Sequence, residues 1–458
     1  MQVINPATEE LLAELEEDDA NTLVRKTAAA RAAQRTWART PLAERLAVVR
    51  RFGDLLQSRG DSLALTLTSE VGKPIRQSRN ELSAMQPRIS FFLEHTAAAI
   101  EEEVVLRSPG PPPLEERIRY EPLGIVASIS AWNYPYFVGS NVFLPALLTG
   151  NAVLYKPSEN ATLSGLAMAE LLHQAGVPRD IFVPVVGAGA TGRMLLEQDV
   201  DVVCFTGSYA TGRKVAEAAA PRLLRVQLEL GGKDPAYVCE DVDVAAAAAA
   251  LAEGAFYNAG QSCCAVERIY VQRRIAGAFV KVFADAVHAL VVGDPLDERT
   301  DVGPLARRAQ LEVLEAQVAD AVEHGARLEF GGRRRAGRGY YFEPTMLTGA
   351  DHRMTLMREE SFGPIIGIQE VGDDAEAIAL MNDTEYGLTA AVYTRDRSRA
   401  EHILAQVNAG SAYWNCCDRV SPRLPWSGRR HSGLGTTLSV AGIRAFVQPK
   451  AWHLRCGA

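Results

Sequence analysis

Two short segments of the sequence carry residues suited to covalent acyl chemistry. Residues 229–233, Glu-Leu-Gly-Gly-Lys, place a carboxylate directly before a glycine pair, and residues 260–264, Gly-Gln-Ser-Cys-Cys, place thiols directly after a segment of helical pattern. A thiolate attacks electrophilic carbon readily and is a good leaving group from a thioester, while a carboxylate can act as a base toward water. Together these groups are the minimum needed to form a thioester and then hydrolyse it.

The sequence around these segments predicts the elements that must position them. Short apolar runs alternate with amphipathic helical stretches, and these runs lie at 124–130, 152–155, 181–186 and 200–205. This alternation is typical of a parallel sheet covered by helices. A second alternating region begins near residue 236 and continues to about 415, and helical periodicity dominates 18–70 and 77–103. The expected fold class is therefore α/β.

Two glycine-containing turns compete as the phosphate-binding site. Residues 187–192 match G-x-G-x-x-G after a predicted strand, but the next strand ends at Phe205 without the acidic residue that would hold a ribose there. Residues 205–208, Phe-Thr-Gly-Ser, lead directly into a helix, whose free N–H groups and dipole favour a pyrophosphate. We favour the second turn, where Ser208 adds a hydroxyl donor.

A cation and a carboxylate follow the predicted strand at 152–155. Lys156 and Glu159 stand in the sequence Lys-Pro-Ser-Glu. Such a pair suits the vicinal hydroxyls of an adenosine ribose. An exposed turn with an ion pair explains the same pattern equally well.

Composition limits the class of protein. The chain has 458 residues, 47% of them hydrophobic and 23% charged, with a net charge of -8. These values are typical of a soluble multidomain globular protein and argue against a nucleic-acid partner. No apolar run is long enough to span a membrane and no signal sequence is apparent, so we expect a cytoplasmic protein without a membrane partner. The seven cysteines show neither C-x-x-C nor zinc spacing, which favours free thiols and no metal.

Six motifs, in order along the chain, resemble those of the NAD(P)-dependent aldehyde dehydrogenase superfamily. They are Trp-Asn-Tyr-Pro at 132–135, Lys-Pro-Ser-Glu at 156–159, Phe-Thr-Gly-Ser at 205–208, Glu-Leu-Gly-Gly-Lys at 229–233, Gly-Gln-Ser-Cys at 260–263 and Glu-Ser-Phe-Gly-Pro at 360–364. The resemblance implies a Rossmann-like coenzyme domain, an α/β catalytic domain and a small β extension that builds homodimers or homotetramers. The expected boundaries are 1–106 and 124–231 for the coenzyme domain, 232–432 for the catalytic domain, and 107–123 and 433–458 for the oligomerisation extension.

The resemblance implies catalytic roles for three residues. Cys263 is the nucleophile that attacks the aldehyde, and the side-chain amide of Asn133, with the backbone N–H of Cys263, stabilises the resulting oxyanion. Glu229 activates the water that hydrolyses the thioester, so the implied product is a carboxylic acid. Chemistry alone does not separate Cys263 from Cys264. The position of Cys263 in the motif assigns it as the nucleophile and leaves Cys264 as a packing residue.

The resemblance also implies a nicotinamide coenzyme, NAD or, less favoured, NADP. The residues implied as its contacts are Trp132, Lys156, Ser158, Glu159, Gly207, Ser208, Gly231, Glu360 and Phe362. Among these, Glu360 is implied as the ligand of the nicotinamide ribose. A carboxylate at Glu159 would repel a 2′-phosphate, which favours NAD over NADP. The turn at 187–192 is then a nearby structural turn.

One departure from the family pattern concerns the substrate. The late motif that commonly reads Pro-Phe-Gly-Gly is Pro-Trp-Ser-Gly at 425–428. Because the resemblance places this region near the substrate tunnel, we expect an apolar, aromatic tunnel lined by Tyr134, Phe137, Val420 and Trp426. An alternative assigns Arg419 or Arg423 to the carboxylate of a semialdehyde, although either arginine fits solvated surface better.

Two other functions compete with hydrolytic oxidation of a small-molecule aldehyde. A CoA-acylating aldehyde dehydrogenase would transfer the acyl group to CoA, but those relatives usually lack the base at Glu229. A family member retained only as a binding protein would be expected to have lost at least one of the catalytic residues. The presence of Asn133, Glu229 and Cys263 together argues against that second alternative.

Overall fold

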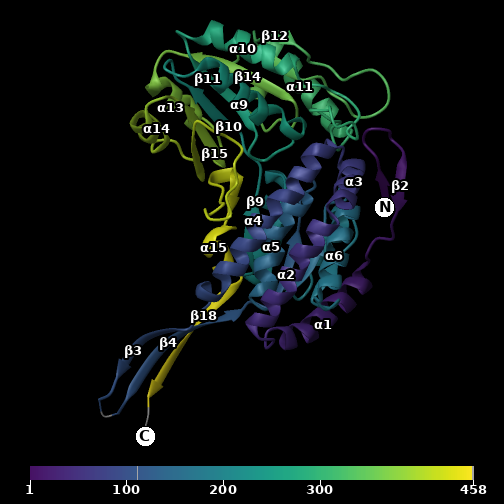
Figure 1. The fold of residues 1–458 in the computed structure, drawn as a ribbon, viewed down its shortest axis with the longest axis vertical. Helices are drawn as coiled ribbons and strands as arrows, with labels where there is room; N and C mark the ends of the chain where they lie inside the picture. Colours follow the sequence, from purple (N-terminus) through teal and green to yellow (C-terminus); the bar gives the residue numbers. More distant parts are fainter. Residues whose placement is uncertain (111, 456–458) are drawn as a thin grey trace.

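Two large sheets and a three-stranded arm organise the chain. The computed structural model describes residues 1–110 and 112–455. The second sheet and its helices lie above the first in Figure 1, and the arm projects from the opposite end of the molecule. A two-stranded sheet near the N-terminus pairs β1 (Gln2–Ile4) with β2 (Leu11–Glu14).

The first sheet has six strands in the order β17-β9-β8-β5-β6-β7. The strands are β5 (Ile125–Ile129), β6 (Ala152–Lys156), β7 (Phe182–Pro184), β8 (Val202–Thr206), β9 (Arg225–Glu229) and β17 (Gly433–Leu434). All neighbours pair in parallel except β17, which is antiparallel to β9. The strands β5, β6 and β8 are almost wholly buried because helices cover both faces of the sheet.

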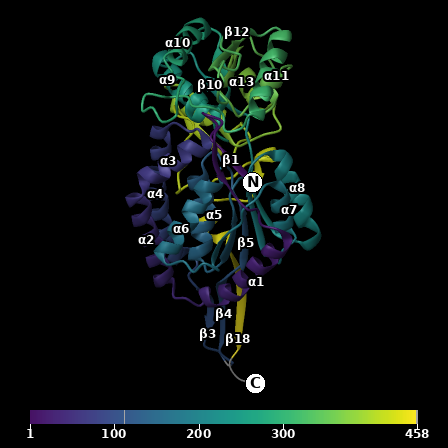
Figure 2. The same ribbon diagram turned by 90° about the vertical axis from the view of Figure 1, so that its right-hand side faces the viewer.

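Eight helices cover this sheet. They are α1 (Ala20–Trp37), α2 (Leu42–Ser58), α3 (Gly60–Val71), α4 (Ile75–Ala99), α5 (Pro135–Leu148), α6 (Thr162–Ala175), α7 (Gly189–Leu196) and α8 (Tyr209–Ala219). Figure 2 shows α2, α4, α5 and α6 on one side of the sheet and α7 and α8 on the other. Nearly every residue of α5 is buried, because α4 and α6 enclose it against the sheet.

The second sheet has seven strands in the order β12-β13-β14-β11-β10-β15-β16. The strands are β10 (Asp234–Val238), β11 (Val266–Gln272), β12 (Arg327–Phe330), β13 (Thr345–Thr348), β14 (Ile365–Val371), β15 (Thr389–Tyr393) and β16 (Ser411–Trp414). Side chains alternate between its two faces, so Tyr237 and Val238 belong to different hydrophobic clusters.

Helices cover both faces of the second sheet. The helices α9 (Val244–Phe256) and α10 (Ala276–His288) supply one hydrophobic cluster. The other cluster draws on α11 (Ala309–Glu323), α12 (Thr355–Arg358), α13 (Asp374–Asn382) and α14 (Arg397–Leu404). The two large sheets and their helices therefore form two layered α/β units with separate cores.

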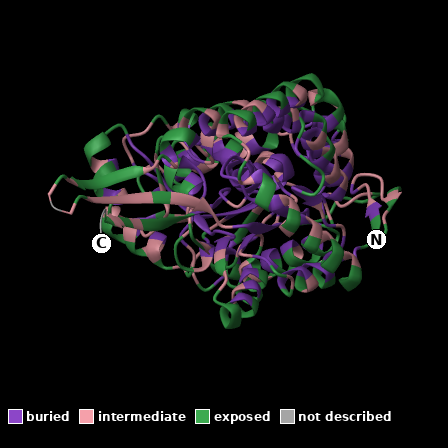
Figure 3. Ribbon diagram, turned by 90° about the horizontal axis from the view of Figure 1, so that it is seen from below, coloured by how far each residue is buried: buried purple, intermediate pink, exposed green. Residues whose placement is uncertain are grey.

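The arm is an antiparallel sheet of β3 (Glu103–Ser108), β4 (Leu114–Pro122) and β18 (Val447–Arg455), in the order β18-β4-β3. It is exposed or half-buried along its length (Figure 3). The segment before β18, residues 433–446, packs on the first sheet and its helices instead of joining the arm. Strand β17 joins the first sheet, and α15 (Ser439–Arg444) packs on α4 and α5. We therefore propose that the extension comprises 103–122 and 447–455, and that 433–446 belong with the first domain. Of the predicted extension, residues 111 and 456–458 lie outside the described part of the chain.

The two large sheets approach each other end to end. Strand β9 finishes at Glu229 and β10 begins at Asp234, so a four-residue connection joins the carboxyl end of one sheet to the amino end of the other. The hydrogen bond from Asn133 Nδ2 to the carbonyl of Gln261 crosses the same junction at 3.2 Å. Ligands of open α/β sheets bind outside the carboxyl ends of the strands, so this junction is where a site is expected.

Candidate active site

Both sheets bring their predicted site residues to this junction. At the carboxyl end of the first sheet, Asn133 follows β5, Lys156 ends β6, Ser208 follows β8 and Glu229 ends β9. At the amino end of the second sheet, Gly231 precedes β10, Cys263 precedes β11, and Glu360 and Phe362 precede β14. Parallel pairing therefore gathers residues that are far apart in sequence along two facing edges.

The loop before Cys263 has a strained backbone. Asn258 and Ala259 have left-handed φ values of 53° and 54°, and Gly260 follows with φ of 69°. A Cβ atom on Gly260 would lie 2.3 Å from the carbonyl oxygen of Gly363, so the position requires glycine. The side chain of Gln261 fixes the loop, because its Oε1 accepts from the N–H of Ala306 at 2.9 Å. Strain of this kind persists only where surrounding contacts hold it, and it concentrates at functional sites.

Asn133 lies beside this loop. Its side-chain Nδ2 donates to the carbonyl of Gln261, and its backbone carbonyl oxygen accepts from Nδ2 of Asn258 at 3.3 Å. The side chain of Asn133 is buried, so both contacts are shielded from water. The amide is therefore held against the segment that carries Cys263, where the family resemblance predicts an oxyanion-stabilising donor.

The two neighbouring cysteines have different surroundings. Cys263 is partly exposed, whereas Cys264 is 4% exposed and donates to Oδ1 of Asp418 at 2.9 Å. Contact with the Cys263 thiol, burial and the Asp418 carboxylate all raise the pKa of Cys264. A buried thiol that is held protonated is a poor nucleophile, so the structure supplies the distinction that the residue types alone did not.

Glu229 accepts a hydrogen bond from the hydroxyl of Thr437, a residue that the sequence did not single out. Burial of the carboxyl group raises the pKa of Glu229 to about 7, while the Thr437 hydroxyl and the positive charge of Arg88 act in the opposite direction. A carboxylate with a pKa near neutrality is well matched to general base catalysis.

The C-terminal part of the chain holds Glu229 in a second way. Gly433 of β17 pairs with Glu229, and the N–H of Leu230 donates to the carbonyl of Ser432 at 3.1 Å. Thr437 is fixed in turn by Trp426, since each residue donates its backbone N–H to the other's carbonyl, at 2.8 and 2.9 Å. The base and the predicted tunnel residue Trp426 are therefore joined through one buried threonine.

Glu360 lies against the glycine pair. Its Oε1 accepts from the N–H of Gly232 at 3.0 Å, and a Cβ atom on Gly231 would lie 2.2 Å from the same carboxylate. Glycine at 231 therefore permits this close approach. Burial and repulsion from Glu267 raise the pKa of Glu360 to about 8.

A buried ion pair fixes the segment that follows Glu360. Lys233 pairs with Glu267, and Lys233 Nζ also donates to the hydroxyl of Ser361 at 3.0 Å. Glu267 in turn accepts from the N–H groups of Ser361 and Phe362 at 2.9 and 3.0 Å. The Phe362 ring meets Trp132 edge to face, with centroids 5.4 Å apart, so the two predicted coenzyme contacts face each other across the junction.

The residues at the ends of β6 and β8 suit a nucleotide. Lys156 is buried, and among the described residues its Nζ donates only to the carbonyl of Pro157, at 3.2 Å, which leaves two donors for hydroxyl groups. Ser158 lies next to the exposed carboxylate of Glu159, with Oγ 3.4 Å from Oε2. Gly207 leads into Ser208, which caps α8 by accepting from the N–H of Thr211 at 3.4 Å. Free donors, a carboxylate and a helix N-terminus are the groups that bind ribose and phosphate.

Acidic residues near the N-terminus accept hydrogen bonds from the N–H groups at the glycine-rich turn 187–192. The N–H of Val186 donates to Asp18 at 2.8 Å, and that of Ala188 donates to Glu17 at 3.1 Å. These acidic residues would repel a phosphate placed on the same N–H groups. The contacts support the interpretation of this segment as a structural turn.

Two of the predicted tunnel residues, Tyr134 and Phe137, each lie against a buried cation. Lys73 Nζ lies 3.6 Å from the ring centroid of Tyr134, and Arg88 Cζ lies 3.1 Å from that of Phe137. Phe137, Val420, Trp132 and Cys263 all pack against the hydrophobic cluster that contains Trp426. The sequence predicted neither burial, because Arg88 lies in a stretch of helical pattern and Lys73 in the turn Gly72-Lys73-Pro74, where charged residues are usually solvated.

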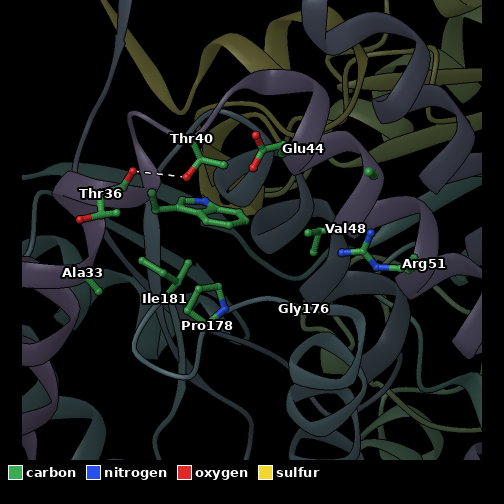
Figure 4. A pocket seen from close by; sticks show the side chains of 11 residues that line it. Ala33, Thr36, Thr40, Glu44, Val48, Arg51, Gly176, Pro178 and Ile181 are labelled. Atoms are coloured by element: carbon green, nitrogen blue, oxygen red, sulfur yellow. Dashed lines mark hydrogen bonds between the residues drawn. The ribbon is translucent and has the colours of Figure 1, made fainter.

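A separate surface cleft of about 650 Å³ lies at the other end of the first sheet. Figure 4 shows it between α1, α2 and the segment that carries Gly176, Pro178 and Ile181. Ile181 precedes β7, so the cleft is at the amino ends of the strands, away from Glu229. Among the described residues, no helix is long and apolar enough to cross a membrane, and no cluster of His, Cys, Asp and Glu is arranged for a metal ion.

The fold and the junction define the class of protein. The chain belongs to the aldehyde dehydrogenase family, whose sequence pattern matches residues 1–452. Members of this family are oxidoreductases that act on aldehydes, in agreement with the expected fold and activity.

Individual relatives support the assignment. The chain is 37% identical to a betaine aldehyde dehydrogenase from Cereibacter sphaeroides, over 99% of this chain and 94% of the relative. It resembles the crystal structure of an NAD-dependent aldehyde dehydrogenase from Sinorhizobium meliloti with a TM-score of 0.96 and 34% identity, covering 100% and 91% of the two chains. It also resembles lactaldehyde dehydrogenase from Escherichia coli, with a TM-score of 0.95, 33% identity and coverage of 99% and 95%.

Proposed function

We propose that this protein oxidises an aldehyde to a carboxylic acid with NAD, through a thioester on Cys263 that is hydrolysed by water activated by Glu229. The observation that carries the proposal is the arrangement at the junction: a partly exposed thiol, an amide held beside it, and a carboxylate whose pKa lies near 7. These three groups provide the nucleophile, the oxyanion donor and the base for one reaction sequence.

In the first half of the reaction, the Cys263 thiolate forms a C–S bond to the aldehyde carbon. The carbonyl oxygen becomes an oxyanion, which the amide of Asn133 and the backbone N–H of Cys263 stabilise. Preorganised donors of this kind contribute roughly 3–4 kcal/mol each in related acyl chemistry. Loss of hydride from this adduct leaves a thioester on Cys263.

NAD, when bound, supplies the hydride acceptor that the oxidation requires. Lys156, Ser158 and Glu159 would hold the adenosine ribose, and Gly207 and Ser208 the pyrophosphate. Trp132, Gly231, Glu360 and Phe362 would hold the nicotinamide end. The exposed Glu159 carboxylate disfavours a 2′-phosphate, which supports NAD rather than NADP.

In the second half, Glu229 accepts a proton from water as the water attacks the thioester. The C–S bond breaks, which releases the carboxylic acid and regenerates the Cys263 thiolate. Transfer to CoA would need no such base, so the position of Glu229 at this junction favours hydrolysis over CoA acylation.

We also propose that the arm forms a homodimer or homotetramer. Strands β3 and β18 are edge strands, and β3 exposes three consecutive apolar residues, Val104, Val105 and Leu106. Exposed apolar edge strands of this kind favour pairing with another chain.

The test of the proposed function is an aldehyde panel followed by NADH absorbance, with and without CoA, in the wild type and in Cys263→Ala. We expect NADH formation without CoA in the wild type and its loss in the variant. NADH formation that requires CoA would contradict hydrolysis, and no NADH from any aldehyde would favour a binding protein. Activity retained in Cys263→Ala would move the nucleophile to Cys264.

A further inference from the structure

Arg88 is a buried cation that lacks a hydrogen-bond or ion-pair partner within the described part of the chain. Its side chain is 1% exposed, and within residues 1–110 and 112–455 none of its three guanidinium nitrogens has a hydrogen-bond partner. It also takes part in no ion pair with a carboxylate of the described chain. A buried guanidinium offers five N–H donors in a fixed fork, and leaving them unpaired is costly. Such a group indicates a position built for a polar ligand.

The neighbouring buried cation, Lys73, has the ion-pair partner that Arg88 lacks among the described residues. Lys73 is also fully buried, but it forms an ion pair with Glu81. Glu81 additionally accepts from the N–H groups of Tyr136 and Phe137 at 3.0 and 3.1 Å. Glu81 is thereby committed to Lys73 and to the start of α5. Among the described residues no carboxylate lies within ion-pair distance of Arg88, and the charges of Glu229 and Glu81 act on it only from farther away.

The position of Arg88 links it to the active site. It stacks on the ring of Phe137, four residues after Asn133, and its positive charge acts on Glu229. One helical turn beyond Phe137, Oδ1 of the buried Asn141 also lacks a hydrogen-bond partner among the described residues. Orphaned polar groups therefore lie on α4 and α5, beside the segment that begins with the predicted oxyanion donor.

We propose that Arg88 binds a carboxylate on the substrate, so that the preferred substrates are ω-oxo acids, aldehydes that carry a carboxylate at their far end. This inference rests on the proposed function, because it names the substrate class of the same site. A carboxylate matches the guanidinium fork with two parallel hydrogen bonds and neutralises its charge.

The positive charge of Arg88 also excludes a cationic substrate. A trimethylammonium group, as in the betaine aldehyde named for several relatives, would be repelled by Arg88 and has no acceptor for its donors. Arg419 and Arg423, the arginines considered from the sequence, are exposed to solvent and lack the desolvated setting that makes such a contact selective. We therefore assign the carboxylate to Arg88 rather than to either of them.

The test compares kcat/KM for three small aldehydes that are anionic, neutral and cationic: succinate semialdehyde, butanal and betaine aldehyde. In the wild type we expect succinate semialdehyde to be preferred over butanal by roughly 30-fold or more, and betaine aldehyde to be the poorest substrate. In Arg88→Met the preference over butanal should disappear, chiefly through a higher KM for succinate semialdehyde. Arg88→Lys, which keeps the charge but not the fork, should retain part of it. Arg423→Met, an exposed control, should retain all of it.

A preference for butanal or betaine aldehyde in the wild type would overturn the inference, as would an unchanged preference in Arg88→Met. Calorimetric titration with succinate provides a readout that does not depend on turnover. We expect succinate to bind the wild type and not Arg88→Met, and absence of binding to the wild type would also overturn the inference. If no aldehyde is oxidised, the proposed function fails, while the titration still decides the carboxylate site. Arg88→Met should fold, because it removes an unpaired buried charge.

Discussion

The hydroxyl of Thr437 donates a hydrogen bond to the carboxylate of Glu229, across a sequence separation of 208 residues. This contact stabilises the ionised form of Glu229, so under the proposed mechanism it makes the C-terminal segment part of the deacylation machinery. The backbone bridge between Thr437 and Trp426 extends the connection to the predicted substrate tunnel. The pH dependence of kcat therefore depends on this hydroxyl group.

The first prediction concerns the wild-type pH profile. Since the pKa of Glu229 is raised to about 7, the carboxyl group is protonated below that pH and cannot accept a proton from water. Where deacylation limits turnover, kcat should rise with pH through about 7 and then reach a plateau. Steady-state NADH formation between pH 5.5 and 9 measures this profile. A rate that is constant across pH 7 would contradict the assigned pKa or the assigned step.

The second prediction concerns Thr437→Val. Loss of a hydrogen bond to a charged group costs roughly 1.5–3 kcal/mol, which corresponds to an upward shift of about 1–2 units in the pKa of Glu229. The ascending limb of the pH profile should move to higher pH by that amount, and kcat at pH 7 should fall by roughly 5- to 50-fold, because the ionised fraction of Glu229 falls by that factor. Thr437→Ser keeps the hydroxyl and should restore the wild-type profile. An unshifted profile in Thr437→Val would show that the hydroxyl does not act on the base.

The third prediction concerns Asn133. Replacing it with alanine removes one oxyanion donor, which should lower kcat by about 10²–10³-fold. The pre-steady-state burst of NADH should slow, because the thiohemiacetal oxyanion forms before hydride is lost. Deacylation should slow as well, since attack of water on the thioester forms a second oxyanion at the same carbon. Rapid-mixing absorbance measurements check this, with NAD binding as a control that should be retained. A burst at the wild-type rate followed by slow turnover would contradict a role for Asn133 in acylation.

The fourth prediction concerns stability. Lys73→Met would leave the buried Glu81 carboxylate without its cation, and breaking such a pair costs about 3–5 kcal/mol. Denaturant unfolding should therefore show a clear loss of stability relative to the wild type. Lys281→Met, the same substitution at an exposed position of α10, should change stability by less than about 0.5 kcal/mol. Equal effects of the two substitutions would contradict the structural role of the pair.

Local sequence patterns predicted the strands of the first sheet and the residues at their ends. Apolar runs at 152–155 and 200–205 correspond to β6 and β8, because buried parallel strands are apolar along their whole length. The stretch 18–70 was expected to be helical and forms three helices instead of one block. Gly60 and Asp61 were expected to end a helical element, and α2 ends at Ser58 just before them, while Pro41 marks the start of α2.

Contacts between distant segments could not be predicted in the same way. Thr437 follows a glycine-rich stretch without any local feature that indicates a partner on β9. Arg88 lies between Met85 and Ile89 in a helical pattern, where a charged residue usually indicates a solvated face. Burial of both residues depends on how α4, α5 and the C-terminal segment pack, which is a property of the whole fold.

The most direct test of the central claim uses Glu229→Gln, mixed with NAD and an aldehyde that the wild type oxidises. We expect a burst of one NADH per active site and almost no further turnover. Mass spectrometry of the quenched protein should then show an acyl group attached to Cys263. The same peptide from Cys264→Ala/Glu229→Gln should carry the same acyl group. Continued turnover at the wild-type rate, or acylation of Cys264 in place of Cys263, would contradict the assignment of nucleophile and base.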